Sequence, residues 1–385
     1  MSALPGFIVI GNAENRRVSL FQDALVRQGL PPAKVVPWRE LLESPSRLAE
    51  LPDTDAFVRI DAAGESWEVE KGLLKRGHED ALAHGGQVLA PDEVDALAED
   101  RGRILAPRQG HLGFLRVLSE LEAVFRERPS WRVLQSPASI RDLFDKRVTS
   151  RKYAALGVPV PEPLDGVTDV ASLRERMDEE GWREVFVKVS CGSSASCLGI
   201  FRRHRGHESL VTTVEQSPRG WFNTLKVRRI RESEPLEQVL DFLLREGSQV
   251  ERSIPKARLG GDLFDCRVLA VRGEPAFIVV RQSRLPITNL HLGGWRGELE
   301  ELEAAVPRNE WDAAMDSCRR VARAHDCLHV GIDLMFEEYF IGHRVLEANA
   351  FGDLLPGLKR DGLTVYEWEI REALRSAGFD APEPA

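Results

Sequence analysis

Three side chains near the C-terminus have the types and the spacing that a metal site requires. Asp333 lies in an apolar run of residues 329–335, and Glu347 and Asn349 lie two positions apart in a second run, residues 344–349. Carboxylate and amide oxygens are hard ligands that suit Mg²⁺, which takes its remaining ligands from water or from a substrate phosphate. If the two runs are neighbouring strands, these side chains can form one magnesium site.

The strand pattern predicts which faces these side chains occupy. Successive side chains of a strand point to opposite faces, so the apolar neighbours of Asp333 are expected on the other face. For the same reason Val345, Glu347 and Asn349 are expected to share one face. Burying a carboxylate among apolar residues without a partner costs free energy, which favours a bound cation. The alternative is a solvated strand face that carries one acid on each strand.

A lysine and a loop of small residues form a second candidate site. Lys188 lies in an apolar strand, and Gly192, Ser193 and Ser194 follow in the loop of residues 191–196. Small residues allow backbone N–H groups to approach phosphate oxygens closely, and a lysine supplies a point charge. The loop is not a Walker A motif, because the lysine precedes the glycine and no Gly-Lys-Ser/Thr follows. The alternative is an ordinary turn.

Two arginines are placed to handle an anion. Asp265 and Arg267 share one face of an expected strand, and Arg281 ends the next strand. Guanidinium groups bind phosphoryl oxygens or a carboxylate through paired hydrogen bonds. The alternative for each is a surface arginine beside an acid, which contributes little to stability.

The elements that must position these residues begin with an α/β pattern. In the first third, strands are expected at residues 7–10, 56–60, 88–89 and 133–134, with a helix through Val18, Phe21 and Leu25 and another at residues 112–126. This alternation predicts a small parallel sheet covered by helices. Residues 11–14 carry no GxGxxG pattern, so a dinucleotide site is not favoured there.

The rest of the chain reads as mixed α and β structure. Two short helices are expected within residues 140–156, a strand at 185–189, a helix at 236–246, strands at 264–271 and 276–281, a helix at 311–324, and strands at 330–335 and 344–348 before a polar tail. The expected domains are residues 1–140, 141–248 and 249–385.

Composition limits the class of protein. The 385 residues are 43% hydrophobic and 29% charged, which is ordinary for a globular chain of two or three domains. A formal charge of −9 lacks the basic excess of a nucleic-acid binder, and no apolar run is long enough to span a membrane. Five cysteines without a CxxC pair argue against a disulfide framework or a zinc ribbon. A cytoplasmic protein is expected.

Taken in order, the segments from about Asp145 to Leu358 resemble the ATP-grasp superfamily. Asp145-Lys146 and the run 153–161 resemble the entry to the grasp fold with its first nucleotide lysine. Lys188 with the Gly/Ser loop resembles the second lysine and the mobile phosphate loop. Glu251, ahead of Ile254-Pro255, resembles the linker that meets adenine and ribose.

The anion-handling segments are similar to one branch of that superfamily. Asp265-Cys-Arg267, Arg281 and the run from Asn289 to Gly294 resemble the glutathione synthetases and the ligases that add glutamate to ribosomal protein. Departures include Cys191 in place of a common proline, and Ala-Phe-Gly-Asp353 in place of a run of small residues and proline.

This resemblance implies a fold and an activity. The expected architecture is α/β (α+β), a small parallel α/β domain followed by an ATP-grasp fold of two α+β subdomains. The implied activity is a Mg²⁺-dependent carboxylate–amine ligase that consumes ATP, forms an acyl-phosphate and produces ADP. Implied roles are nucleotide binding for Lys146, Lys188, Gly192, Ser193, Ser194 and Glu251, metal binding for Asp333, Glu347 and Asn349, and catalysis for Arg267, Arg281 and Asn289.

The resemblance leaves partners and alternatives open. The acceptor can be an amino acid, a peptide or a protein, nucleic acid and membrane are not expected as partners, and a homo-oligomer is possible because relatives often are. Asp61, Glu65 and His111 are candidates for acceptor contact, although solvated loop positions are the favoured reading. The alternative functions are a small-molecule kinase of the ATP-grasp type and a non-catalytic nucleotide-binding protein.

Overall fold

The N-terminal part contains a four-stranded parallel sheet. The computed structural model describes residues 4–44, 46–192, 196–352 and 355–379. The sheet has the order β2-β1-β3-β4, formed by β1 (Gly6–Gly11), β2 (Lys34–Pro37), β3 (Ala56–Ile60) and β4 (Trp131–Val133). The predicted parallel α/β domain is confirmed. The strand expected at residues 88–89 is wrong, because this pair lies in irregular chain between two helices.

Seven helices belong to the described residues of the same part of the chain. They are α1 (Arg16–Arg27), α2 (Trp38–Glu43), α3 (Ser46–Ala49), α4 (Trp67–Leu82), α5 (Pro91–Ala96), α6 (Pro107–Arg126) and α7 (Pro137–Leu143). Among these described helices, α5 packs on α4 and not on the sheet. Helices α4 and α6 approach each other closely at two glycines. A Cβ atom on Gly77 would lie 1.9 Å from the carbonyl oxygen of Gln109, so only glycine allows this contact.

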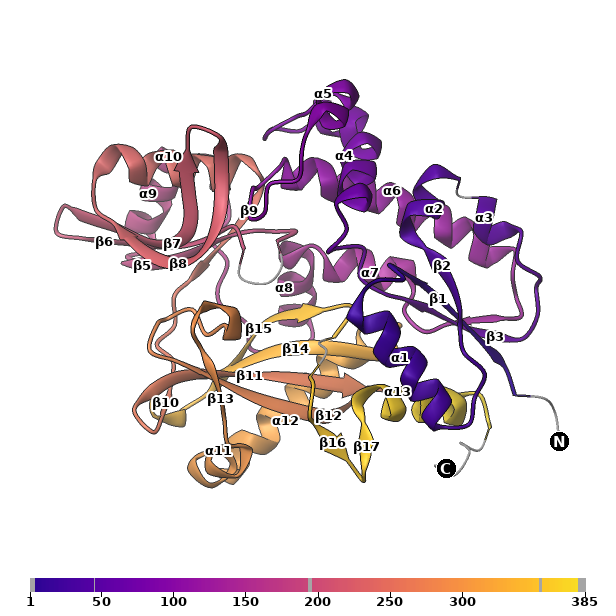
Figure 1. Ribbon diagram of the computed structural model, residues 1–385. Coiled ribbons are helices and arrows are strands. Elements are labelled where there is room, and N and C mark those ends of the chain that lie inside the picture. Colours follow the sequence, from indigo (N-terminus) through magenta and orange to yellow (C-terminus); the bar gives the residue numbers. More distant parts are fainter. Residues whose placement is uncertain (1–3, 45, 193–195, 353–354, 380–385) are drawn as a thin grey trace.

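The second unit is a five-stranded antiparallel sheet of order β8-β7-β6-β5-β9, which occupies the left of Figure 1. Its strands are β5 (Glu184–Val189), β6 (Leu198–His204), β7 (His207–Ser217), β8 (Gly220–Ile230) and β9 (Ser248–Arg252). Helices α9 (Val170–Glu179) and α10 (Ser233–Arg245) pack against it through apolar side chains. We call this unit the lid sheet. The expected domain boundary after residue 248 falls at the first residue of β9, and the one after residue 140 falls within α7, preceding α8 (Lys146–Ala155).

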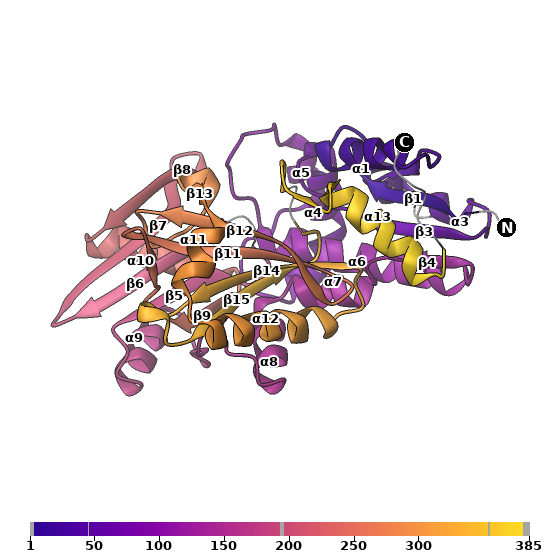
Figure 2. The same ribbon diagram turned by 90° about the horizontal axis from the view of Figure 1, so that it is seen from below.

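The third unit is an antiparallel sheet of order β13-β12-β11-β14-β15, with β10 paired to β11. Its strands are β10 (Arg258–Leu259), β11 (Asp262–Val271), β12 (Glu274–Ser283), β13 (Trp295–Gly297), β14 (His329–Phe336) and β15 (His343–Asn349). Short helices η1 (Leu290–Leu292), α11 (Leu299–Ala305) and η2 (Glu338–Phe340) lie in its connections, and α12 (Arg308–Arg323) covers one face (Figure 2). Every residue of β14 is buried, so the predicted acid in this strand sits inside the molecule.

The C-terminal segment returns to the first domain. The expected polar tail is wrong from residue 359 onward, because β16 (Lys359–Arg360), β17 (Leu363–Thr364) and α13 (Val365–Ser376) follow. Thr364 and Glu367 form a capping box that starts α13. In both views α13 lies beside α1, and the rings of Phe21 and Tyr366 are 6.1 Å apart. Among the described residues, none of the helices has both the length and the apolar composition needed to cross a membrane.

Candidate active site

Strand pairing brings the predicted acids and arginines together. Asp333 of β14 lies opposite Glu347 of β15 on one side and opposite Arg267 of β11 on the other. Arg281 of β12 lies opposite Asp265 of β11. The expected pairing of the strands that carry Asp333 and Glu347 is confirmed, whereas their closeness to the two arginines was not predicted. Asp265, Asp333, Arg267 and Arg281 are buried or nearly so and Glu347 is only partly exposed, which makes a solvated strand face and isolated surface arginines the wrong alternatives.

The expectation that Val345 shares a face with Glu347 is wrong. Asp333 pairs with Glu347, but the next residue of β14 pairs with Val345, so Leu346 is an extra residue in β15. A bulge of this kind inverts the alternation of side chains. Val345 therefore faces the core, and Leu346 and Glu347 both line the cavity described below.

Asp333 is held by two guanidinium groups. Its Oδ1 accepts hydrogen bonds from Arg267 Nε at 2.5 Å and lies 3.0 Å from Arg281 Nη2, while its Oδ2 is 3.2 Å from Arg267 Nη2. Burial alone would raise the pKa of Asp333, but the two arginines hold it well below its ordinary value. Asp333 is therefore a permanent anion at neutral pH.

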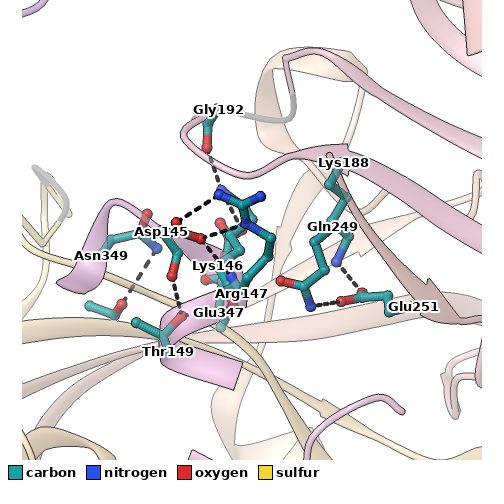
Figure 3. Close-up of polar contacts among 12 residues, drawn as sticks. Asp145, Lys146, Arg147, Thr149, Lys188, Gly192, Gln249, Glu251, Glu347 and Asn349 are labelled. Carbon is teal, nitrogen blue, oxygen red and sulfur yellow. Dashed lines mark hydrogen bonds and ion pairs between the residues drawn. The ribbon is translucent and has the colours of Figure 1, made fainter. Parts of the chain in front are cut away.

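The two predicted nucleotide lysines approach the acids from other elements. Lys146, the first residue of α8, donates to the carbonyl oxygen of Gly192 and lies 3.4 Å from Glu347 Oε2 (Figure 3). Lys188 of β5 forms a buried ion pair with Glu251 of β9. Burial opposes the charge of Lys188, yet its pKa is raised because Glu251 and Glu347 are close.

Of the remaining predicted residues, Asn349 and Asn289 each make a hydrogen bond to the backbone. Asn349 Nδ2 donates to the carbonyl oxygen of Gly331 at 3.4 Å. Asn289 accepts a hydrogen bond from the backbone N–H of His291 at 2.7 Å and so caps η1, although it also lines the cavity. Ser193 and Ser194 lie outside the described residues.

These side chains surround one cavity of about 110 Å³ between the lid sheet and the third sheet. Most of the predicted residues line it, namely Lys146, Lys188, Gly192, Arg267, Arg281, Asn289, Asp333 and Glu347. Its volume is below the roughly 300 Å³ of typical small-molecule sites, and the ion-paired side chains Asp333 with Arg267 and Asp265 with Arg281 are among those that line it.

Several lining residues were missed from the sequence. Lys256 and Thr288 are polar, and Phe186, Leu198 and Leu346 form apolar walls. Lys256 follows Ile254-Pro255 directly, so its place beside the linker was a usable signal. No pattern marked Leu346, because the bulge that turns it toward the cavity depends on strand register.

The donor set fits a hard divalent cation. The described part of the chain gathers no group of three His, Cys, Asp or Glu side chains at one point. Asp333 and Glu347 nevertheless face each other across a strand pair, and Asn349 lies two residues further along β15, opposite Gly331. Two carboxylates and an amide suit Mg²⁺ when phosphate oxygens complete its shell.

The N-terminal candidates do not form one site. Asp61 is only 1% exposed and lies 3.6 Å from the equally buried Arg59, so a solvated position is wrong for it. Glu65 is exposed and accepts a hydrogen bond from Asn15 at 2.9 Å. His111 stacks on Phe144, and burial lowers its pKa to about 4.

The described fold has solved counterparts. A scan against protein-family models and a search of curated proteins found no match. The ATP-grasp ligase PsnB in complex with a minimal precursor is 15% identical, with a TM-score of 0.53 over 97% of this chain and 99% of that chain. The D-cycloserine synthetase DcsG is 15% identical, with a TM-score of 0.55 over 96% and 100%. The macrocyclase MdnC from Microcystis aeruginosa MRC, bound to its precursor peptide MdnA, is 11% identical, with a TM-score of 0.51 over 96% and 99%. At this identity the likeness is one of fold.

Proposed function

We propose that this chain, which has the ATP-grasp fold, is an ATP-dependent ligase that activates a carboxylate and joins it to an amine. The observation that carries the proposal is the single cavity in which three lysines, two arginines and three carboxylates meet, mainly from α8, the lid sheet and the third sheet. Such convergence of buried charge serves phosphoryl transfer, in which positioning and charge neutralisation supply most of the rate.

The cavity supports a division of labour toward ATP. Phe186, Leu198 and Leu346 offer apolar surface for a base, and Lys146 and Lys188 offer charge for phosphates. Mg²⁺, when held by Asp333, Glu347 and Asn349, would supply positive charge to the β- and γ-phosphates. Glu251, which pairs with Lys188 in the structure, would be released toward the ribose.

The proposed reaction has two steps. An oxygen of the substrate carboxylate attacks the γ-phosphorus, and the bond from this phosphorus to the β,γ-bridging oxygen breaks. ADP is the leaving group, and the product is an acyl-phosphate. The amine then attacks the acyl carbon, phosphate departs and the amine loses a proton, which yields an amide. Arg267 and Arg281 would neutralise the charge that develops on the phosphoryl group and on the tetrahedral intermediate. Closure of the lid sheet would keep water from the acyl-phosphate.

The substrate class has partial support. Two of the similar structures, those of PsnB and MdnC, contain precursor peptides. A peptide or protein is therefore a reasonable member of the substrate panel, beside free amino acids. We also propose that the enzyme acts on these substrates in the cytoplasm.

The test is phosphate release from ATP and Mg²⁺ across amino acids and peptides, with hydroxylamine in a parallel series. Substrate-dependent release with hydroxamate formation is expected, since hydroxylamine traps an acyl-phosphate. ADP formation without hydroxamate would favour the kinase instead. Nucleotide binding without any turnover across the panel would favour the non-catalytic alternative.

A further inference from the structure

A third lysine enters the cavity, and nothing in the proposed reaction uses it. Lys256 lies between β9 and β10, and only 10% of its side chain is exposed. Its Nζ donates to Thr288 Oγ1 at 2.9 Å and lies 3.6 Å from Asp265 Oδ2. Burying a charged ammonium group costs hydration free energy, and hydrogen-bond partners or a bound anion must compensate this cost.

One carboxylate organises this corner of the cavity. Asp265 Oδ1 accepts from Arg281 Nε at 2.7 Å, and its Oδ2 accepts from the hydroxyl of Thr288. Both oxygen atoms of Asp265 are therefore engaged, and the carboxylate is 5% exposed. Lys256 and Arg281 are thus held on opposite oxygens of the same side chain, and both line the cavity.

The two cations at this corner, Lys256 and Arg281, share the carboxylate of Asp265. Burial lowers the pKa of Lys256, and the nearby charges of Arg281 and Lys188 lower it further against the effect of Asp265. Arg281 interacts with both Asp265 and Asp333. Asp333 in turn has Arg267 as its second partner. An incoming anion between Lys256 and Arg281 would relieve the repulsion between these two cations.

We propose that Lys256 and Arg281 together bind the carboxylate that is activated, and that Asp265 and Thr288 are positioning residues for them. The inference rests on the proposed function. A carboxylate or its acyl-phosphate matches two cations held side by side, because each oxygen can accept from one donor. Lys146 and Lys188 have carboxylate partners of their own, Glu347 and Glu251, although the charge of Lys188 also acts on Lys256.

The test uses acetyl phosphate, a small acyl-phosphate, titrated by calorimetry into the full-length protein saturated with Mg²⁺ and ADP. Lys256→Met is expected to weaken acetyl phosphate binding about tenfold or more, because a charge-assisted hydrogen bond is lost. The affinity for MgADP is expected to change less than about twofold. Arg258→Met, which removes an exposed charge two residues away, should leave both affinities unchanged.

Each other outcome has a distinct meaning. An equal loss of MgADP affinity in Lys256→Met would assign Lys256 to the nucleotide and overturn the inference. Unchanged binding of acetyl phosphate, or no binding by the wild-type MgADP complex, would overturn it as well. Failure of the wild-type protein to bind MgADP would instead overturn the proposed function.

Thr288 supplies a second variant that does not alter charge. Thr288→Val is expected to weaken acetyl phosphate binding severalfold with MgADP binding retained, and Thr288→Ser is expected to restore it. A purely structural role would lower the melting temperature of Thr288→Val and leave the ratio of the two affinities unchanged, which would contradict the positioning role.

Discussion

At the scale of single residues, charge pairing governs the candidate site. Asp333 contacts Arg267 and Arg281, and Glu347 contacts Lys146, so each acid already carries a cation. The two Asp333 pairs are nearly buried, where removing one partner costs far more free energy than on the surface, whereas Lys146 and Glu347 are partly exposed. If a nucleotide enters with Mg²⁺, the acids would pair with the metal and the cations would pair with the phosphates. Few charges would then be left unpaired.

Replacing Glu347 should abolish turnover without unfolding the protein. We expect Glu347→Ala to lower the rate of substrate-dependent phosphate release by about a hundredfold or more, because the proposed cation site loses one of two carboxylates. Glu347 is partly exposed, so the melting temperature should change by only a few degrees. Glu338→Ala, an acid exposed on η2, is the matched control. Wild-type rates in purified Glu347→Ala protein would contradict the metal assignment.

The depressed pKa of Asp333 predicts how stability depends on pH. A carboxyl whose folded pKa is lowered stabilises the fold above its unfolded pKa of about 3.9 and loses that contribution as pH falls through the folded pKa. Asp333→Asn should therefore be less stable than wild type at pH 7. The difference in unfolding free energy, measured by urea titration, should shrink below about pH 4. A difference that is constant with pH would refute this origin.

At the scale of elements, α13 closes the N-terminal domain through a buried ion pair. Arg59 of β3 donates to Glu369 Oε2 of α13 at 2.7 Å, and both side chains are almost completely buried. The guanidinium group also lies over the rings of Phe21 and Tyr366, at 4.9 Å and 5.1 Å from their centroids. The last helix is therefore part of the first domain's core.

Breaking this pair from one side should be costly. We expect Glu369→Leu to lower the free energy of unfolding by about 3 kcal/mol, since Arg59 is left buried without its main partner. The double variant Arg59→Met/Glu369→Leu should recover much of the loss, because no unpaired charge remains. Urea unfolding of the wild type, both single variants and the double variant measures the coupling. Additive losses would show that the pair contributes little.

At the scale of the whole molecule, apolar contacts hold the lid sheet against the third sheet. Leu198 and Ile200 of β6 form a buried cluster with Ile287 and Leu292, which belong to the connection between β12 and β13. This cluster borders the cavity, since Leu198 and Ile287 also line it. Because ion pairs and apolar contacts border the same cavity, we expect the two sheets to separate when the proposed nucleotide enters.

Weakening the cluster should shift the molecule toward an open state. Ile287→Ser removes apolar contact worth about 1–3 kcal/mol, so the KM for ATP is expected to rise about tenfold. The release of phosphate from ATP without formation of the amide product should also increase, because water reaches and hydrolyses the acyl-phosphate. Leu225→Ser, at a site that is 73% exposed on β8, is the control. An unchanged KM would show that closure does not depend on these contacts.

The sequence by itself determined the local structure and the inventory of chemistry. The apolar run around Asp333, the pair Asp265 and Arg267 on one face, and the order of lysines before acids were all readable from residue types. These features depend on alternation along one strand or on order along the chain. The strands that carry Lys188, Asp265, Arg281, Asp333 and Glu347 were predictable for the same reason, since hydrophobic period is a local property. Strands β6, β7, β8 and β9 and helices α9, α11 and α13 were not predicted.

Only the tertiary structure decided the features that depend on partners distant in sequence. The bulge at Leu346 became visible only when β15 was paired with β14, and it reversed the predicted face of Val345. The place of α13 depends on Arg59, a residue more than half the chain away. Lys256 became part of the site because Thr288 and Asp265 reach it across the third sheet. Pairing register and burial arise from the whole chain, so no local pattern could have specified them.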